Sequence, residues 1–363
     1  MYIKELELNN FRNYEHLNIS FSKEVNIFLG ENAQGKTNLL EGIYLNAVAR
    51  SFKTQRDREM IRFGDDFCKV RAVAHYDDED HTSEIIVSRN GVKAVKVDGV
   101  KISRSSELLD RLHIIVFSPE DLKIVKDEPG KRRGFINREL CQIRPGYVND
   151  LNNYRRILRQ RNAYLKEERI DDSILQIWNE ELIKSGSRLI RERRKFINKI
   201  DEISRDIHHR ISGGKETLQL SYETQIDREG EEEACFAEIL AEYEEKDRIY
   251  GSTQKGPHHD DLKISADGID MRKFGSQGQQ RTAALSLKLS EIKIIEEETG
   301  QSPVLLLDDV LSELDNERQK YLINSLGENQ MFITTTDLIG SVARALPEGK
   351  VFKIRNGEVD IEI

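Results

Sequence analysis

The pattern of apolar and polar positions changes character twice along the chain of 363 residues. Over residues 1–117, apolar residues alternate with polar ones or form short runs, which is typical of half-buried and buried β-strands. Asn90-Gly91 and Asp98-Gly99 predict tight hairpin turns, because both central positions of such turns favour a left-handed backbone. The clearest predicted strands cover residues 3–8, 17–21, 25–29 and 113–117.

From residue 118 to residue 250 the spacing of apolar residues becomes helical. Ser118-Pro119-Glu120-Asp121 predicts a helix start, with Ser as the capping residue, Pro at the first helical position and an acidic residue three positions on. Farther on, spacings of mostly three, four and seven predict one helix of about 35 residues, or about 50 Å. Its apolar stripe consists of Ile174, Ile177, Trp178, Leu182, Leu189, Phe196, Ile200, Ile203 and Ile207.

Strand character returns at Asp261-Leu262-Lys263-Ile264 and continues to a last predicted hairpin turn at Asn356-Gly357. The pattern therefore predicts an α/β domain made of residues 1–117 and 251–363. A mainly helical domain, residues 118–250, interrupts it.

The strongest chemical signal is a phosphate-loop pattern, G-x-x-x-x-G-K-[ST], at Gly30-Glu31-Asn32-Ala33-Gln34-Gly35-Lys36-Thr37. A predicted strand, residues 25–29, precedes it, and residues 38–44 have helical spacing. Glycines let backbone N–H groups turn toward phosphate oxygens, and the helix N-terminus adds positive potential. Lys36 can reach the β- and γ-phosphates and the Thr37 hydroxyl can bind Mg²⁺. The sequence thus predicts a binding site for a nucleoside triphosphate with Mg²⁺.

The second half of this site is expected about 270 residues downstream, where the apolar run 303–307 ends in Asp308 and Asp309. Such a run is typical of a buried parallel strand, which would present Asp308 at its carboxyl end beside the phosphate loop. We expect Asp308 to hold Mg²⁺ and Asp309 to orient or deprotonate the attacking water.

Composition favours a reducing compartment and a local basic surface. The three cysteines lie far apart, which argues against a disulfide framework or a zinc site. No signal peptide or membrane-spanning run is evident at the sequence level, so we expect a soluble cytoplasmic protein. The net charge is −9, but residues 131–210 hold 20 Lys and Arg against 12 Asp and Glu, a local charge of +8 that leaves −17 elsewhere. This asymmetry is typical of a polyanion-binding segment, although a solvated helical face would look the same.

Two further segments point to a class of ATPases. Gly275-Ser276-Gln277-Gly278-Gln279-Gln280-Arg281 precedes a predicted helix, and Ser312-Glu313-Leu314-Asp315 follows the Asp pair. With the phosphate loop, they resemble the ABC-type ATPase heads of the SMC and Rad-fifty families, and more closely those of the RecF family. The stretches that resemble the RecF family are Leu8-Asn9-Asn10-Phe11-Arg12-Asn13-Tyr14, Gly30 to Thr37, Phe117-Ser118-Pro119-Glu120-Asp121-Leu122, Gly256-Pro257-His258-His259-Asp260-Asp261-Leu262, and Leu307-Asp308-Asp309-Val310-Leu311-Ser312-Glu313-Leu314-Asp315.

The resemblance implies an ABC-type head with mixed sheets that sandwiches ATP in a homodimer. Ser276, Gln277, Gly278 and Gln279 would then contact ATP held by the second subunit, with Asp315 and its turn nearby. Arg12 resembles the early arginine that touches nucleotide phosphates in these heads.

The resemblance also implies a function in recombinational DNA repair. ATP binding would drive dimerisation and clamping on duplex DNA near single-strand gaps or junctions, and hydrolysis would release the DNA. The implied partners are RecR, with RecO acting alongside, in loading recombinase onto gapped DNA and supporting replication restart and the SOS response. In the basic segment, Arg191, Arg193 and Arg194 are the expected phosphate contacts.

Departures from the family pattern predict a weak ATPase that acts as a switch. Gln277 stands where transporters usually have Gly, and Asp309 is one methylene shorter than the usual Glu. Thr336 occupies the place of the expected switch histidine, and no glutamine of the water-positioning loop is evident near Ser118-Pro119-Glu120.

Two rival functions remain open at this stage: a DNA-binding clamp with negligible ATP turnover, and the nucleotide-binding subunit of a membrane transporter. Two local patterns are set aside. Asn198-Lys199-Ile200-Asp201 has guanine-recognition spacing but lies inside the predicted long helix. His258-His259-Asp260-Asp261 looks like a metal cluster, but neighbouring strand residues point to opposite faces, so a structural role is expected.

Overall fold

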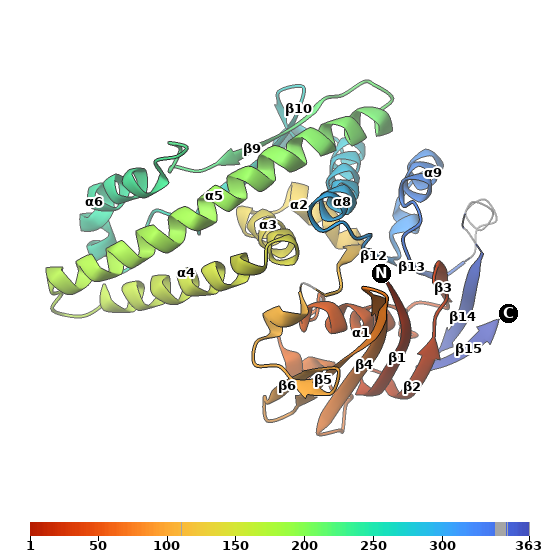
Figure 1. Cartoon of the computed structure of the whole chain (residues 1–363). Coiled ribbons are helices and arrows are strands. Elements are labelled where there is room, and N and C mark those ends of the chain that lie inside the picture. The colour runs from red at the N-terminus through yellow and green to blue at the C-terminus, as the bar shows by residue number, and fades with distance from the viewer. Residues whose placement is uncertain (110, 338–345, 347, 363) are drawn as a thin grey trace. The chain divides into compact units, whose positions relative to one another are not determined.

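The computed structural model describes residues 1–109, 111–337, 346 and 348–362 (Figure 1). It divides into two compact units. Unit 1 comprises Met1–Asp121 and Glu291–Ile363, and unit 2 comprises Leu122–Ser290. Each unit has its own core.

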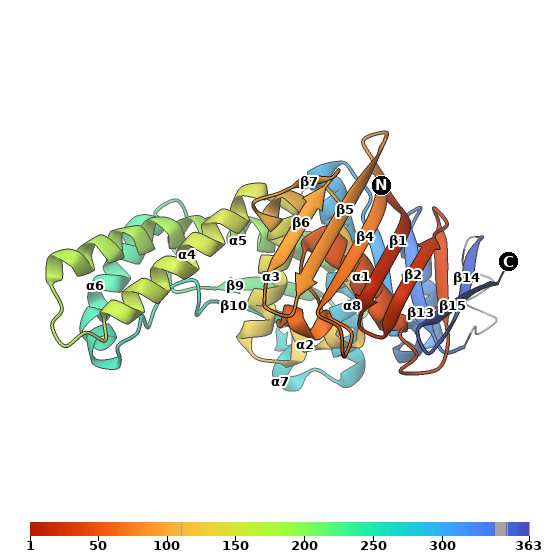
Figure 2. The same ribbon diagram turned by 90° about the horizontal axis from the view of Figure 1, so that it is seen from below.

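Unit 1 contains two six-stranded sheets. In the first, shown in Figure 2, all neighbouring strands are antiparallel and the order is β2-β1-β4-β5-β6-β7. Its strands are β1 (Tyr2–Phe11), β2 (Tyr14–Ser20), β4 (Phe67–Tyr76), β5 (Glu79–Ser88), β6 (Lys93–Val97) and β7 (Val100–Lys101).

The second sheet is mixed, with the order β15-β14-β3-β13-β12-β8. All its neighbouring pairs are parallel except β14 and β15. Its strands are β3 (Val25–Leu29), β8 (Ile114–Phe117), β12 (Val304–Asp308), β13 (Met331–Thr335), β14 (Gly349–Arg355) and β15 (Glu358–Glu362).

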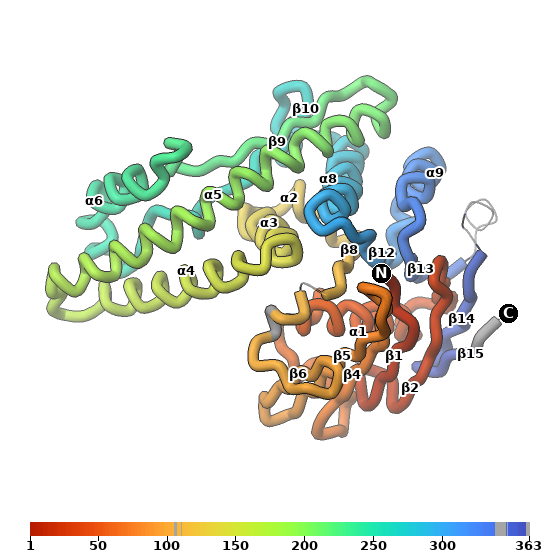
Figure 3. The backbone as a smooth tube through the Cα atoms, viewed as in Figure 1, coloured from red at the N-terminus to blue at the C-terminus, as the bar shows by residue number. Residues whose placement is uncertain are grey.

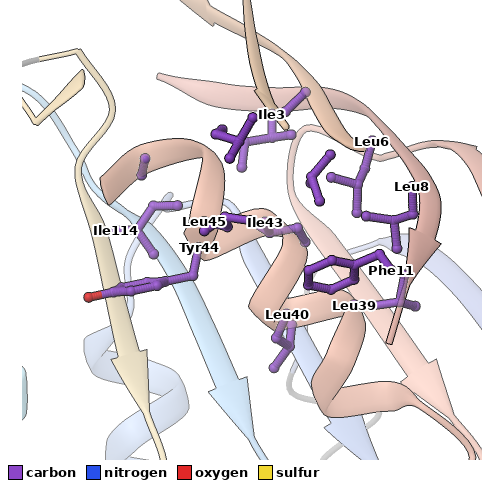
Figure 4. Close-up of a cluster of buried hydrophobic side chains, with 14 of the residues drawn as sticks. Ile3, Leu6, Leu8, Phe11, Leu39, Leu40, Ile43, Tyr44, Leu45 and Ile114 are labelled. Atoms are coloured by element: carbon purple, nitrogen blue, oxygen red, sulfur yellow. The ribbon is translucent and has the colours of Figure 1, made fainter. Parts of the chain in front are cut away.

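Helix α1 (Lys36–Val48) fills the space between the two sheets and carries much of their common core (Figure 4). Leu39, Leu40 and Ile43 of α1 are fully buried against β1 and its neighbours. Each such side chain contributes about 1.5–3 kcal/mol by leaving water. Gly42 allows the close approach of β1, because a Cβ atom there would lie 2.9 Å from Leu8 Cδ2. The phosphate loop is therefore anchored through α1 to both sheets.

Among the described residues, the other helices that lie wholly in unit 1 are short, and the second part of α8 (Gln277–Thr299) also belongs to this unit. The short helices are η1 (Asp57–Met60), η2 (Ser105–Leu108), η3 (Pro119–Asp121), η4 (Val310–Glu313) and α9 (Asn316–Ser325).

The hairpin turns predicted at Asn90-Gly91, Asp98-Gly99 and Asn356-Gly357 are confirmed. A further hairpin, between β4 and β5, turns at Asp77 and Asp78 with φ of 51° and 63°. Aspartate tolerates this left-handed conformation better than most residues, so the turn forms without the glycine that would have revealed it.

Unit 2 combines helices with a three-stranded antiparallel sheet of order β11-β10-β9. Its elements are α2 (Leu122–Lys126), α3 (Pro129–Ile143), α4 (Pro145–Tyr164), α5 (Asp172–Ile211), β9 (Leu218–Glu223), α6 (Glu232–Tyr250), β10 (Asp261–Ala266), β11 (Ile269–Asp270), α7 (Met271–Phe274) and the first part of α8 (Gln277–Thr299).

The limits of unit 2 differ from the interruption expected at residues 118–250. Strand β9 lies inside the segment expected to be helical, and it pairs with β10 along its whole length. This pairing ties residues after 250 to unit 2. At the other end, residues 118–121 form only a 3₁₀ turn, in which the Ser118 N–H donates to Asp121 Oδ2 at 2.7 Å.

The long predicted helix is α5, a single helix of 40 residues that Figure 3 shows as one continuous coil. Its apolar stripe differs from the expected one in the first turn: Ile174 and Ile177 are 44% and 60% exposed, whereas Leu175 is buried. Trp178, which also belongs to the expected stripe, is only half-buried. From Leu182 onward the expected stripe is buried, except for Ile203, which is half-buried.

The segment His258–Asp261 forms hydrogen bonds with several elements of unit 2. His258 Nδ1 lies 2.6 Å from the Tyr154 hydroxyl, and Asp261 accepts two hydrogen bonds from Arg132. Burial lowers the pKa of His258 to about 4, which keeps the ring neutral. The two histidines do not alternate as strand residues would, because they lie in a turn before β10 and their rings are 4.3 Å apart. Within the part of the chain that the structure describes, no group of three or more His, Cys, Asp and Glu side chains could hold a metal ion.

Candidate nucleotide-binding site

The loop from Gly30 to Gly35 joins β3 to the N-terminus of α1. Its two glycines are required for different reasons. Gly35 has φ of 115°, and a Cβ atom there would lie 2.5 Å from Asn13 Nδ2. A Cβ atom at Gly30 would lie 2.5 Å from the carbonyl oxygen of Ile354. The loop thus has the tight turn and helix N-terminus that bind phosphate groups.

Lys36 lies back along this loop. Its Nζ donates to the carbonyl oxygens of Gly30 and Glu31 at 2.5 and 2.9 Å. Burial lowers the pKa of Lys36, while the nearby carboxylates of Asp309 and Asp308 act in the opposite direction. The ammonium group is therefore held between the loop and the Asp pair, where phosphate oxygens would meet it.

Thr37 and Asp308 form the predicted metal-binding pair. The Thr37 hydroxyl donates to Asp308 Oδ1 at 2.8 Å, although the two residues are 271 positions apart. Burial raises the pKa of Asp308, and hydrogen bonds from Thr37 and Thr334 oppose this shift. Mg²⁺ usually takes one or two protein oxygens and fills its other positions with phosphates and water. The pair fits such an ion.

Asp309 follows directly at the carboxyl end of β12, with a left-handed backbone at φ of 54°. Its N–H donates to the Thr334 hydroxyl at 2.9 Å. Thr336, which occupies the place of the switch histidine, is exposed just beyond β13.

Arg12 lies beside the loop but is held by another carboxylate. Its Nε and Nη2 donate to Glu41 at 2.8 and 2.6 Å, and Nη1 donates to the Glu59 carbonyl at 2.6 Å. An arginine has five N–H donors, so two remain for a phosphate. Arg12 also lines a cavity of about 640 Å³, together with Asn13, Asn38, Arg58, Glu59, Ile61, Phe63 and Arg89.

Three features of the site are missed by motif matching. Thr334 pairs in parallel register with Asp308 and donates to its Oδ1 at 3.0 Å. The charge of Lys53 acts on the Asp308 carboxyl. The turn of the last hairpin holds the phosphate loop, because Gly357 N–H donates to the Gln34 carbonyl and Asn356 N–H to Gln34 Oε1, at 3.2 and 2.6 Å. Only a polar residue at the carboxyl end of β13 hints at any of them in the sequence.

The expected signature segment lies in unit 2, where Ser276 precedes α8 and Gln277, Gly278 and Gln279 form its first turn. The phosphate loop, Arg12 and the Asp pair belong to unit 1. Ser276 caps the helix: its Oγ accepts from the Gln279 N–H at 3.3 Å, and Gln279 Oε1 accepts from the Ser276 N–H at 2.8 Å. Ser276 and Gln277 are exposed. Asp315 has a comparable role in unit 1, where it caps α9 through the Arg318 N–H.

The basic segment 131–210 corrects one expectation. Arg193 is buried and donates to the Pro257 carbonyl at 2.6 Å, and it also contacts Tyr147 and Asn137. Arg194 is bound to Glu232 at 2.7 Å and to the Ile226 carbonyl. Both were expected to contact phosphates, but their donors stabilise unit 2 because they satisfy buried acceptors. Arg191 remains partly exposed beside Glu232.

Exposed cations remain on one face of α5. Lys184, Arg188, Arg191 and Lys195 follow one another at spacings of four, three and four, which places them in line along the helix. We call these four residues the α5 stripe. Its ion pairs with Asp150, Glu232 and Glu192 are 3.3–3.4 Å long at the surface.

A helix that starts at a phosphate loop, lies between an antiparallel and a mixed sheet, and faces an Asp pair defines an ABC-type ATPase head of the SMC-like class. The solved Smc head bound to the C-winged helix domain of ScpA shares this fold, with a TM-score of 0.59 at 18% identity, covering 100% of this chain and 97% of that one. The model of the RecF/RecN/SMC N-terminal domain family matches residues 2–356.

Closer relatives give the family. The DNA replication and repair protein RecF of Agathobacter rectalis is 46% identical over 366 residues, and that of Lachnoclostridium phytofermentans 43% over 363, each covering 99% of both chains. The solved recombination mediator protein RecF–ATP in the RecFOR pathway matches with a TM-score of 0.93 at 38% identity, covering 100% of this chain and 98% of that one. The chain belongs to the RecF family.

Membership of this family removes the transporter subunit from the rival functions. In the described parts of the chain, no helix is both long and apolar enough to cross a membrane.

Proposed function

We propose that this protein binds ATP with Mg²⁺ and dimerises around it, and that the dimer clamps duplex DNA in recombinational repair. The observation that carries the proposal is the joint geometry of Lys36, Thr37 and Asp308, which provides a cation and a metal-binding pair at one helix N-terminus. Membership of the RecF family supports ATP as the nucleotide. The cavity beside Arg12 is large enough for its ribose and base.

A second copy would complete each site through Ser276, Gln277, Gly278 and Gln279. Gln277 begins a helix of 23 residues and this segment is exposed or half-exposed, so the positive potential of the α8 N-terminus can act on an anion at the surface. A γ-phosphate bound to the loop of another copy fits this chemistry. ATP would then act as a bridge, and dimerisation would require it.

Hydrolysis would release the clamp slowly. Asp309 would act on the attacking water, but its carboxylate is one methylene shorter than glutamate, and Thr336 cannot replace the missing histidine as a base. The protein would therefore be a weak ATPase that works as a switch. A clamp without turnover remains the second candidate because of Thr336, and a single-turnover assay with and without DNA separates the two.

In the cell, the proposed dimer would act near single-strand gaps or junctions, with RecR and RecO in loading recombinase. The solved relative is itself a recombination mediator of the RecFOR pathway. Replication restart and the SOS response are the processes that such loading would serve.

A mixture of two inactive variants tests the composite site. Lys36→Met spoils the phosphate loop, and Ser276→Arg spoils residues 276–279, which we call the capping segment. A heterodimer of the two variants therefore retains one intact site. We expect each variant alone to lose ATP-dependent dimerisation and turnover, and the mixture to regain up to about a quarter of wild-type turnover, assuming random pairing and independent sites. Turnover is measured by phosphate release. Heterodimers that form without any recovery would contradict independent sites built in trans.

A second experiment tests the DNA surface. Neutralising Lys184, Arg188 and Lys195 of the α5 stripe to Gln should weaken binding to all duplex sequences about equally, because phosphate contacts carry no sequence information. If all three contact phosphates, the slope of log affinity against log salt becomes shallower by up to ~2.7.

The matched control neutralises three exposed cations of unit 1, Lys23, Lys101 and Arg104. It should leave the salt slope unchanged. An unchanged slope in the α5 variant, with ATP binding intact, would place the DNA surface elsewhere.

A further inference from the structure

Glu216 connects the exposed start of α8 to the buried end of α5. Gln279 Nε2 donates to Glu216 Oε1 at 2.9 Å. Glu216 Oε2 lies 3.3 Å from His208 Nε2, and His208 Nδ1 lies 3.2 Å from the Ser286 hydroxyl. His208 and Ser286 are fully buried, and Glu216 is half-buried. All four residues belong to unit 2.

The hydrogen bond between Gln279 and Glu216 orients the Gln279 side-chain amide. An ionised carboxylate only accepts hydrogen bonds, so the Gln279 NH₂ group must face Glu216 and its Oε1 must face the Ser276 N–H. Ser276 Oγ in turn accepts from the Gln279 N–H, while the Ser276 carbonyl accepts the first bond of the helix. The capping pair is thereby complete, and the hydroxyl hydrogen of Ser276 can donate to a phosphate oxygen.

His208 supports Glu216 from within the fold. The Ser286 hydroxyl donates to the Thr282 carbonyl at 2.7 Å, so its oxygen accepts from His208 Nδ1–H. The ionised Glu216 carboxylate can only accept, so its contact with His208 is a hydrogen bond when His208 Nε2 also carries a proton and the ring is an imidazolium. His208 lies in the last turn of α5 and Ser286 lies in α8, so Glu216 is held by residues of two helices.

We propose that Glu216, supported by His208, is a positioning residue for the contact between Ser276 and the ATP of a second copy. Glu216 acts through Gln279. It orients the side-chain amide of Gln279, and this amide holds the reciprocal hydrogen bonds between Gln279 and Ser276 in place. This inference rests on the proposed function, in which the capping segment acts in trans. It predicts that removing the Glu216 side chain weakens ATP-dependent dimerisation and leaves the binding of ATP to the phosphate loop of the monomer unaltered.

The test compares Glu216→Ala with Glu216→Gln in the full chain. The dissociation constant of the dimer is measured by sedimentation with saturating ATP and Mg²⁺. ATP binding is measured with a fluorescent ATP analogue at protein concentrations low enough for the protein to remain monomeric. Losing a hydrogen bond to a charged group should weaken the dimer of the Ala variant about tenfold. The Gln variant should dimerise like the wild type, since its Oε1 can accept from Gln279 and its NH₂ can donate to a neutral His208.

Glu223→Ala, at an exposed glutamate of β9, is the control and should behave like the wild type. Circular dichroism establishes folding, and Glu216→Asp, which is one methylene shorter, replaces the Ala variant in the same comparison if that variant unfolds. Ser276→Arg is the reference for a capping segment that cannot act.

The outcomes distinguish the contact of Ser276 with ATP in trans from the positioning role of Glu216. If Ser276→Arg dimerises normally with ATP, the action in trans fails, and the inference fails with it. If Ser276→Arg blocks dimerisation but Glu216→Ala has a wild-type constant, only the positioning role is overturned. If the folded Ala and Gln variants are equally impaired in dimerisation, the positioning role is also overturned, because the hydrogen bonds of residue 216 would not explain the defect.

Discussion

Replacing Lys36 with Met is expected to lower ATP turnover at least about a hundredfold, because the ammonium group that stabilises charge on the transferred phosphoryl group is lost. The fold should persist. Burial lowers the pKa of Lys36, which means that the folded protein disfavours the charged form, and an apolar side chain of similar length removes that cost. We expect the free energy of unfolding to change by no more than about 1 kcal/mol.

Phosphate release measures the turnover of this variant, and thermal unfolding measures its stability. Lys101→Met, at an exposed position of unit 1, serves as the matched control and should match the wild type in both assays. Wild-type turnover in Lys36→Met would overturn the assignment of the phosphate loop.

The largest loss of stability is expected from Asp247→Ala. Asp247 and Arg161 are both completely buried, and Arg161 Nη1 donates to Asp247 Oδ2 at 2.8 Å. Arg161 also donates to Asn179 and Thr253, so the pair joins α4, α5 and α6. Removing the carboxylate leaves a guanidinium charge in the core without its counter-ion, which typically costs about 3–5 kcal/mol.

Urea unfolding provides the measurement, with Glu245→Ala on the exposed side of α6 as the control. The control should stay within about 0.5 kcal/mol of the wild type. The double variant Arg161→Met with Asp247→Leu should be more stable than Asp247→Ala, because it removes both charges together. A loss below about 1 kcal/mol in Asp247→Ala would mean that water reaches the pair or that the arginine finds another partner.

The nucleotide site was predictable where its chemistry is local. The loop around Lys36 is encoded by glycines whose backbone must turn and by the residues that start a helix, so its pattern carries its geometry. The strand before Asp308 was equally clear, because a strand buried on both faces is a short apolar run. Strand β9 was not predictable in this way, because it lies in a segment with helical surroundings and is stabilised by pairing with β10.

The contacts around these residues were predictable only in part. The approach of Thr37 to Asp308 was predictable, because the carboxyl ends of parallel strands lie at one edge of a sheet. The hydrogen bonds of Thr334 with Asp308 and of the last hairpin turn with Gln34 depend on which strands become neighbours. Strand order is decided by packing over hundreds of residues, and no local pattern records it.

Charge shows the same division between sequence and structure. The sequence by itself determined that residues 131–210 are basic and that a long helix runs through them. It could not say which cations face water. Only the tertiary structure decided that Arg193 lies buried among Tyr147, Asn137 and the Pro257 carbonyl, while Lys184 and Lys195 stay exposed. The physical reason is that a charge can be buried only where distant parts of the chain bring acceptors to it, and those acceptors come together only in the folded protein.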